Sequence, residues 1–503
     1  MRSETLAPRA AAPAAATAPA AAGRAATVDS RAPTDLVGVE GIVTTLFALL
    51  GWIVGSARLN DNSFFWHLRT GEHILDHGIP HHDVFSYTAP GAEWVAQSWL
   101  AEVAYGLVDR VAGAYGLRVF TGLVGVAIFV LAYRLALRLA GGWLRAAGIT
   151  FVALAGVITL WSARPLVLGV LFFVVLLWIV EIPDSLVGRH PLISIPVLLW
   201  LWVNVHGSFA LGVGYLGLHL VGRWIEGASP LRGRERLLLG GAGIGLAVSL
   251  VNPYGLALLT FPIELLSRGE ILSQVVEWQS PDFRERWGVA LAAWICLYVV
   301  ALARGTHRVG RRDLVVTVPM LVLALWATRN IAVAPLVGLP VVARAFATDG
   351  TREGVRFRRG VVAVACAAIG FVIVVLAVGM SAERSFAAKG YPVAAMRYLE
   401  RNDLLGSRLF TDDADAGYVI LRYWPEQRVF MDDRFDMFPT RIIEDFLDVS
   451  RARPEWAKVL DRHDVEVVVW PKDQALAAAL DESGDWDRVH TDRTFAVWLR
   501  PGT

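Results

Sequence analysis

The fold is organised around one polar stretch, RLNDNSFFWHLRTGEHILDHGIPHHDVFSYTAPGAEWVAQSWLAE, which spans Arg58–Glu102 and follows the first long apolar run of the chain. Ionisable residues crowd its first half, namely Asp61, His67, Glu72, His73, Asp76, His77, His81, His82 and Asp83. Aromatic residues are spread among them: Phe64, Phe65, Trp66, Phe85, Tyr87, Trp94 and Trp99. So much aromatic surface favours a loop packed at an interface over a freely solvated one.

The composition places this stretch in a membrane protein. The 503 residues are 55% hydrophobic and 18% charged, with a mean hydropathy of +0.49, which is too apolar for a soluble protein of this size. The net charge of +1 offers no basic surface for phosphates, so the sequence predicts no nucleic-acid partner. Cys296 and Cys366 both lie in apolar runs, and no disulfide framework is implied.

About eleven apolar runs of spanning length, roughly 17 to 25 residues each, occur between residues 36 and 380. They predict a transmembrane bundle with a large first external loop at 58–115. Arginines gather in alternate loops, which predicts a multi-pass protein of the cytoplasmic (inner) membrane with a cytoplasmic N-terminus. Residues 1–35, rich in Ala and Pro, are interpreted as a disordered cytoplasmic tail.

The chain changes character after the last run. Residues 381–503 have ordinary polarity, and an odd number of spans would place them outside the cytoplasm. Helical stretches alternate there with short apolar segments such as VEVVVW at 465–470. This alternation predicts an extracytoplasmic α/β domain.

Two carboxylates of the first loop are candidate catalytic groups. Asp61, between Asn60 and Asn62, could act as a general base toward an acceptor hydroxyl, or it could be the N-cap of the helix that follows. Asp83 is the second acidic candidate.

Three histidines of the loop are substrate-binding candidates. His67 falls in the expected helix, whereas His81 and His82 fall in a turn, where substrate contact and plain turn polarity are both open interpretations. His73 and His77 have the i, i+4 spacing of metal ligands but lack the intervening Glu of metalloproteases, so no metal site is predicted.

Polar residues at the outer ends of other runs point to the same side. Asn204 and His206 would line a binding site or form a clasp between helices. Arg329, with Asn330 beside it, suits a donor phosphate because a guanidinium binds such groups in a bidentate manner, although an arginine at a helix end can also simply reach toward water. Arg164 has a similar claim.

Two acidic loop segments complete the candidates. Glu277 and Trp278 could form a sugar platform or pack beneath the external domain. The segment VFMDDRFDMF, with Asp432, Asp433, Arg434 and Asp436, is interpreted as a salt-bridged structural turn.

The whole pattern resembles bacterial polytopic glycosyltransferases of the GT-C type. The resemblance rests on these residues of the first loop and beyond: Asp61, Trp66, His67, Leu68, Gly71, Gly78, Ile79, Pro80, Asp83, Phe85, Ser86, Trp94, Trp99, Leu100, Glu102, Asn204, His206, Gly207, Asn252, Pro253, Tyr254, Gly255, Arg329, Asn330, Tyr391 and Pro392. It implies transfer of a sugar from a polyprenyl-phosphate-linked donor to a glycan or lipid-linked acceptor of the cell envelope. It further implies that Asp61 is the catalytic carboxylate and that Arg329 steadies the leaving phosphate.

The chain departs from this family in two ways. Its second external loop, about Ser162 to Pro165, lacks the acidic pair that holds a divalent metal in oligosaccharyltransferase-like members, so we expect no metal and no other cofactor. Asp61 is also a single acid where several members carry a pair. Two alternatives remain open: a transporter or flippase of lipid-linked saccharides, and a non-catalytic protein of envelope assembly.

Overall fold

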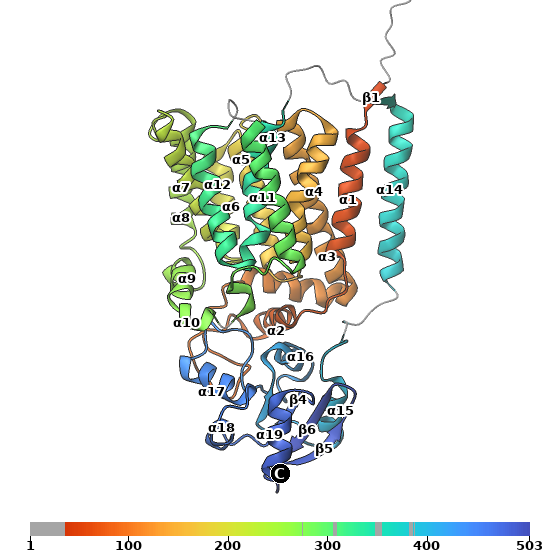
Figure 1. Ribbon diagram of the computed structural model, residues 1–503, viewed down its shortest axis with the longest axis vertical. Helices are drawn as coiled ribbons and strands as arrows, with labels where there is room; N and C mark the ends of the chain where they lie inside the picture. The colour runs from red at the N-terminus through yellow and green to blue at the C-terminus, as the bar shows by residue number, and fades with distance from the viewer. Residues whose placement is uncertain are drawn as a thin grey trace, which may run out of the picture.

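A computed structural model describes residues 36–273, 275–304, 309–347, 355–381, 386 and 388–502. The chain up to residue 381 is mostly helical, and a smaller domain of helices and strands lies at one end of this helical body (Figure 1). The predicted tail at 1–35 lies outside the described residues.

Helices dominate the first part of the chain. They are α1 Glu40–Gly55, α2 Asn62–His77, α3 Trp99–Ala140, α4 Trp143–Thr159, α5 Leu166–Glu181, α6 Pro191–Val203, α7 Phe209–Ile225, α8 Gly233–Val248, α9 Leu256–Ser267, α10 Gly269–Leu272, α11 Arg286–Arg304, α12 Arg311–Trp326, α13 Ala334–Ala345 and α14 Arg359–Met380. Two short 3-10 turns are η1 Val276–Trp278 and η2 Thr328–Ala332. Most of these helices run side by side as a bundle (Figure 1).

The apolar character of the bundle fits a membrane. Among the described residues, α3, α11 and α14 are long and apolar enough to cross a bilayer, and six shorter apolar helices accompany them: α1, α4, α5, α6, α7 and α9. On α14, Val364 and Phe371 are 69% and 68% exposed. A row of such side chains is unfavourable in water but favourable against lipid. The expected total of eleven spans stays a prediction.

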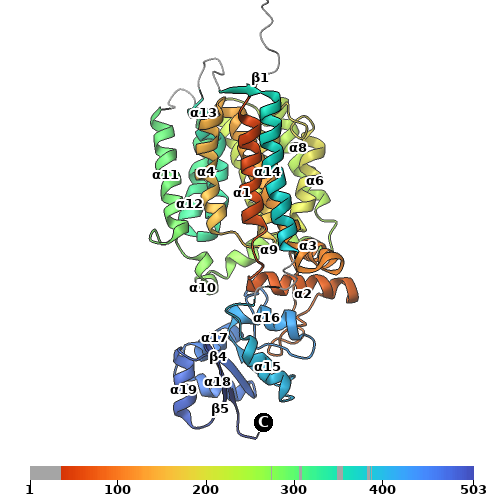
Figure 2. The same cartoon turned by 90° about the vertical axis from the view of Figure 1, so that its right-hand side faces the viewer.

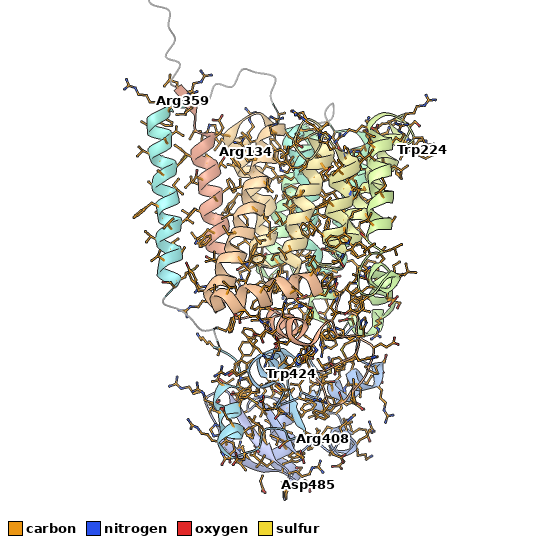
Figure 3. The ribbon with its side chains drawn as sticks, turned by 180° about the vertical axis from the view of Figure 1, so that it is seen from behind. Arg134, Trp224, Arg359, Arg408, Trp424 and Asp485 are labelled. Atoms are coloured by element: carbon orange, nitrogen blue, oxygen red, sulfur yellow. The ribbon has the colours of Figure 1, made fainter. Side chains whose placement is uncertain are left out.

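The two ends of the bundle differ. Figure 3 shows Arg134 and Arg359 at the end away from Trp424 and Arg408. At that same end β1, Leu36–Gly38, pairs antiparallel with β2, Arg356–Arg358. Arg134 and Arg359 belong to the arginine-rich segments predicted to face the cytoplasm. They lie at the end of the bundle opposite the C-terminal domain. Which side of the membrane each end faces stays a prediction.

Helix α2 lies between the bundle and the C-terminal domain (Figures 1 and 2). Its N-cap is Asp61, whose Oδ1 accepts a hydrogen bond from the backbone N–H of Phe64 at 2.9 Å. Gly71 lets α2 approach α3 closely, because a Cβ there would lie 1.9 Å from the carbonyl oxygen of Glu102. Helix α3 bends at Gly113, where φ is 59°, and only its second part joins the bundle.

The C-terminal domain is of the predicted α/β class. Its elements are α15 Val393–Arg401, β3 Leu409–Thr411, α16 Asp413–Tyr423, α17 Thr440–Ser450, α18 Trp456–Arg462, β4 Val467–Pro471, α19 Ala475–Ser483, β5 Asp487–Thr491 and β6 Phe495–Leu499. The strand order is β3-β4-β6-β5, with β3 and β4 parallel and the other pairs antiparallel. The β-branched run of β4 is buried, as its sequence indicates.

The first loop and the C-terminal domain share one hydrophobic core. Phe64, Phe65 and Phe85 pack in the same buried cluster as Phe410 and Trp470. Backbone hydrogen bonds join the two parts as well, since Val429 donates to Phe85 and accepts from Tyr87, both at 3.1 Å. The domain is therefore fixed to the loop whose polar residues were singled out in the sequence.

Candidate functional site

A cavity of about 470 Å³ lies where the bundle end, α2 and the C-terminal domain meet. Every one of these parts contributes to its wall, and the lining residues are Asn62, Ser63, Trp66, His67, Trp94, Val95, Ala96, Gln97, Glu102, Arg164, Pro165, Leu166, His206, Phe261, Leu265, Leu272, Val275, Val276, Glu277, Trp278, Arg329, Asp413, Ala414, Asp433, Arg434, Phe435, Asp436, Phe446 and Leu447. A concave site with few, converging charged groups is typical of ligand binding.

Arg164 connects two carboxylates at the cavity. Its Nε lies 2.9 and 3.2 Å from the two oxygens of Asp61, and its Nη1 lies 2.6 Å from Oε1 of Glu277. Asp61 thus serves as a helix cap and as an ion-pair partner at once, and it stands just behind the cavity wall. The pair is about a quarter exposed on both sides, so solvent still reaches it.

Arg329 lines the cavity with its guanidinium 4.4 Å from the centre of the Trp278 ring. Within the part of the chain that the structure describes, Arg329 has neither a hydrogen bond nor an ion pair to its side chain. Burial lowers the pKa of Arg329. Nearby Arg164 lowers it further, whereas nearby Glu277 opposes the shift. A half-buried cation without an anionic partner is a suitable site for an anionic ligand.

His206 and Asn204 lie close in sequence but have different surroundings. His206 lines the cavity, and its Nδ1 accepts a hydrogen bond from the backbone N–H of Ser208 at 3.0 Å. Burial and the neighbouring Arg329 and Arg164 lower the pKa of His206 to about 3, so its ring is neutral. Asn204 is fully buried and clasps two helices: it accepts from Trp99 Nε1 at 2.8 Å and donates to a carbonyl of α6.

Besides Asp61 and Asn204, four further sequence candidates lie outside the cavity lining. Asp83 is 7% exposed, and its Oδ1 lies 2.7 Å from Nη2 of Arg434. His81 and His82 are exposed, and the His81 ring packs on Tyr254. The fourth, Asn330, donates a hydrogen bond to the carbonyl of Leu323.

The cavity also contains a pair that the sequence did not single out as a pair. His67 Nδ1 lies 2.7 Å from Glu102 Oε1, and both side chains are buried. In the sequence, Glu102 stands out only as part of the pattern shared with the GT-C type. It lies 35 positions from His67, a separation from which no contact between the two side chains can be predicted. The signal in the sequence was a carboxylate placed in the first turn of a long apolar helix.

Asp433 also lines the cavity, although the sequence predicted only a structural role for it, in a salt-bridged turn. The predicted salt-bridged turn does exist, because Asp432 and Arg434 form an ion pair at 2.6 Å. Asp433, however, lines the cavity and accepts hydrogen bonds from Ser63, from Trp66 Nε1 and from Asn62 Nδ2, the last at 3.1 Å. Burial raises the pKa of Asp433 to about 6.

The donor set of the site is mixed. No group of three or more His, Cys, Asp and Glu side chains among the described ranges is arranged to hold a metal ion. The arginines that line the cavity are Arg164, Arg329 and Arg434, of which Arg434 is paired with Asp432. Carboxylates and the His67–Glu102 pair lie around them. Such an arrangement can hold an anion beside groups able to accept a proton.

The sequence matches no protein-family model and no curated protein. Its structure is similar to the archaeal oligosaccharyltransferase AglB from Archaeoglobus fulgidus in complex with an inhibitory peptide and a dolichol-phosphate, with a TM-score of 0.51 and 12% identity over 86% of this chain and 69% of that one. A second structure of the oligosaccharyltransferase of the same organism, in complex with Zn and sulfate, has a TM-score of 0.49 and 12% identity over 86% and 68%.

This likeness confirms at the level of the fold what the residue pattern of the first loop suggested. The match covers 86% of this chain. A membrane location agrees with the apolar helices. The chain has the fold of the GT-C type membrane glycosyltransferases.

Proposed function

We propose that the chain transfers a sugar from a polyprenyl-phosphate-linked donor to a glycan or lipid-linked acceptor of the cell envelope, on the external face of the cytoplasmic membrane. The observation that carries this proposal is Arg329, a half-buried guanidinium at the cavity that lacks an anionic partner among the described residues. A phosphate group is the ligand that such a fork of donors fits. The similar AglB structure was obtained with a dolichol-phosphate, which supports a lipid-linked donor.

The residues around Arg329 suit the remaining parts of the reaction. The Trp278 ring packs against the guanidinium, and as a cavity residue it also offers apolar surface to a sugar. Arg164 adds positive charge near the leaving phosphate, and Asp61 and Glu277 hold it in place. Stabilisation of a departing phosphate by such preorganised cations would lower the barrier to breaking the glycosidic bond.

Asp61, expected from the sequence to accept the acceptor's proton, has a different proposed part here. Both of its oxygens accept hydrogen bonds from Arg164, and one of them also caps α2. A base in this position would have to give up its ion pair as it took a proton. We therefore assign Asp61 to the orientation of Arg164, and Asp83, paired with Arg434, to the joint between the first loop and the C-terminal domain.

The test is transfer of radiolabelled sugar from a panel of polyprenyl-phosphate donors, in membranes with and without the protein. We expect label in an envelope acceptor only where the protein is present. If no donor of the panel gives transfer, the proposal is wrong. Movement of the intact labelled donor across sealed vesicles would then favour the transporter alternative, and an absence of both would favour the assembly protein.

A further inference from the structure

His67 and Glu102 form a buried, hydrogen-bonded pair at the cavity, and the proposed function has so far given this pair no role. His67 comes from α2 and Glu102 from the first turn of α3, at the point where Gly71 brings these helices into contact. The distance from Nδ1 to Oε1 is 2.7 Å, and the side chains are 8% and 1% exposed. The pair is therefore held by packing from both helices.

We propose that His67 accepts the proton of the acceptor hydroxyl and that Glu102 positions its ring. This inference rests on the proposed function and adds the group that activates the acceptor. With Nδ1 engaged by Glu102, the ring nitrogen left for substrate is Nε2, which has no hydrogen bond among the described residues, and His67 lines the cavity. A histidine oriented by a carboxylate through its other nitrogen is a general arrangement for proton transfer.

The second carboxylate oxygen of Glu102 adds independent support. Oε2 is buried and has no hydrogen-bond partner in the described structure, although the side chain is only 1% exposed. A buried, half-satisfied carboxylate costs stability unless it has a role that offsets the cost. Positive charge on the imidazole, held at Oε1, would offset part of this cost by stabilising the carboxylate as a whole.

Burial and nearby positive groups favour the neutral form of His67 at rest. The groups are Arg164 ahead of α5, His206 between α6 and α7, and Arg434 of the C-terminal domain. Glu102, the partner of His67, is itself buried, and burial raises the pKa of its carboxyl group well above the usual value. Burial, and then Arg164, His206 and Arg434, lower the pKa of His67 well below 6.5. The ring is thus unprotonated at neutral pH, which is the state that a base requires.

The acceptor oxygen forms a bond to the anomeric carbon while Nε2 of His67 takes the hydroxyl proton. The bond from the anomeric carbon to the phosphate oxygen breaks, and its electron pair leaves with the phosphate that Arg329 holds. Glu102 stabilises the resulting imidazolium until the proton passes to solvent.

Three variants of the full chain test the inference in the labelled-sugar assay. His67→Asn keeps a side-chain N–H near the position of Nδ1 for Glu102 but removes Nε2. Glu102→Gln keeps the shape of the partner and removes its charge. His77→Asn, at the exposed end of the same helix, is the matched control. We expect kcat to fall about 100-fold or more in His67→Asn and about tenfold in Glu102→Gln, with a smaller change in KM, as for loss of a general base.

The pH profile separates a base from a structural group. In the wild type, kcat/KM should fall as the pH drops through the lowered pKa of His67, well below 6.5, since the base must be neutral. This acidic limb should be absent in His67→Asn. Thermal unfolding of the same samples checks that both variants fold. If the wild type transfers sugar and folded His67→Asn matches it in rate and pH profile, the inference is wrong while the proposed function stands. If the wild type transfers no sugar from any donor, both are overturned.

Discussion

The carboxylate of Asp61 lies 2.9 Å from Nε of Arg164 while it also caps the first turn of α2. Asp61→Asn would keep the cap, because Asn is a good N-cap residue, but it would remove the charge that orients Arg164. We expect sugar transfer to fall about tenfold, which corresponds to about 1.4 kcal/mol in the transition state. The measurement is kcat/KM at equal expression.

The control for this variant is Asp76→Asn, near the end of α2, which breaks an exposed ion pair with Arg110 of α3. It should leave transfer unchanged. A loss of about a thousandfold or more in Asp61→Asn, with the acidic limb of the pH profile gone, would instead assign the proton acceptor to Asp61.

Asp83 is expected to matter for stability. It lies 2.7 Å from Arg434, whose side chain is 1% exposed, and this pair joins the first loop to the C-terminal domain. Arg434 keeps its pair with Asp432, but Asp83→Ala leaves the buried backbone N–H of Ser86 without its acceptor. The free energy of unfolding should therefore fall by about 1–3 kcal/mol. Asp464→Asn breaks an exposed pair with Arg408 and keeps a residue type that tolerates the φ of 47° at this position, so it should cost about 1 kcal/mol or less. Equal thermal shifts in the two variants would contradict this assignment.

The approach of α2 to α3 at Gly71 sets the distance between His67 and Glu102. A methyl group there would meet the carbonyl oxygen of Glu102 at 1.9 Å, so Gly71→Ala must separate the helices. We expect a loss of about 1–3 kcal/mol in stability, together with reduced transfer in protein that remains folded. Gly214→Ala on α7, where a Cβ meets nothing within 4 Å, should leave transfer unchanged and should not lower stability, because Ala favours a helix over Gly. Full activity in folded Gly71→Ala would count against the His67–Glu102 pair.

Asp415 gives the C-terminal domain a pH-dependent stability. The side chain is 7% exposed, and burial, followed by nearby Asp412, raises its pKa from 3.8 to about 8. Between these values the folded state holds a proton that the unfolded state has lost, so the free energy of unfolding decreases as the pH rises. Asp415→Asn should remove this decrease and stabilise the chain at pH 8 by roughly 2–5 kcal/mol.

Thermal unfolding of the full chain at pH 5 and pH 8 measures this effect. The exposed Asp485→Asn serves as the control and should leave both transitions where they are in the wild type. If Asp415→Asn shows the same difference between pH 5 and pH 8 as the wild type, another group is responsible for it.

Local patterns of the sequence predicted local structure well. The Asp61 cap, the buried strand around Val467–Pro471 and the α/β character of the last domain follow from residue types and spacing alone. The likeness to a GT-C fold was also visible in the first loop. Each of these features depends on residues that are close together in the sequence or on a residue pattern known from a family.

The assembly of the cavity could not be read in the same way. His67 and Glu102 meet because two helices cross at a glycine, and Asp433 reaches Ser63 across 370 positions. In VFMDDRFDMF the visible ion pair of Asp432 and Arg434 accounts for those two residues, but the side chain between them lies on the cavity. Long-range packing decided this, and no local spacing carries that information.

The most direct test of the account compares wild type, Arg329→Gln and Arg284→Gln in transfer of labelled sugar from a polyprenyl-phosphate donor. Arg284 is exposed and does not line the cavity, so it controls for the loss of one surface charge. We predict transfer by the wild type and by Arg284→Gln, and a loss of about 100-fold in kcat/KM in Arg329→Gln, as for removal of a group that stabilises the departing charge. Equal transfer by Arg329→Gln and the wild type would contradict the account.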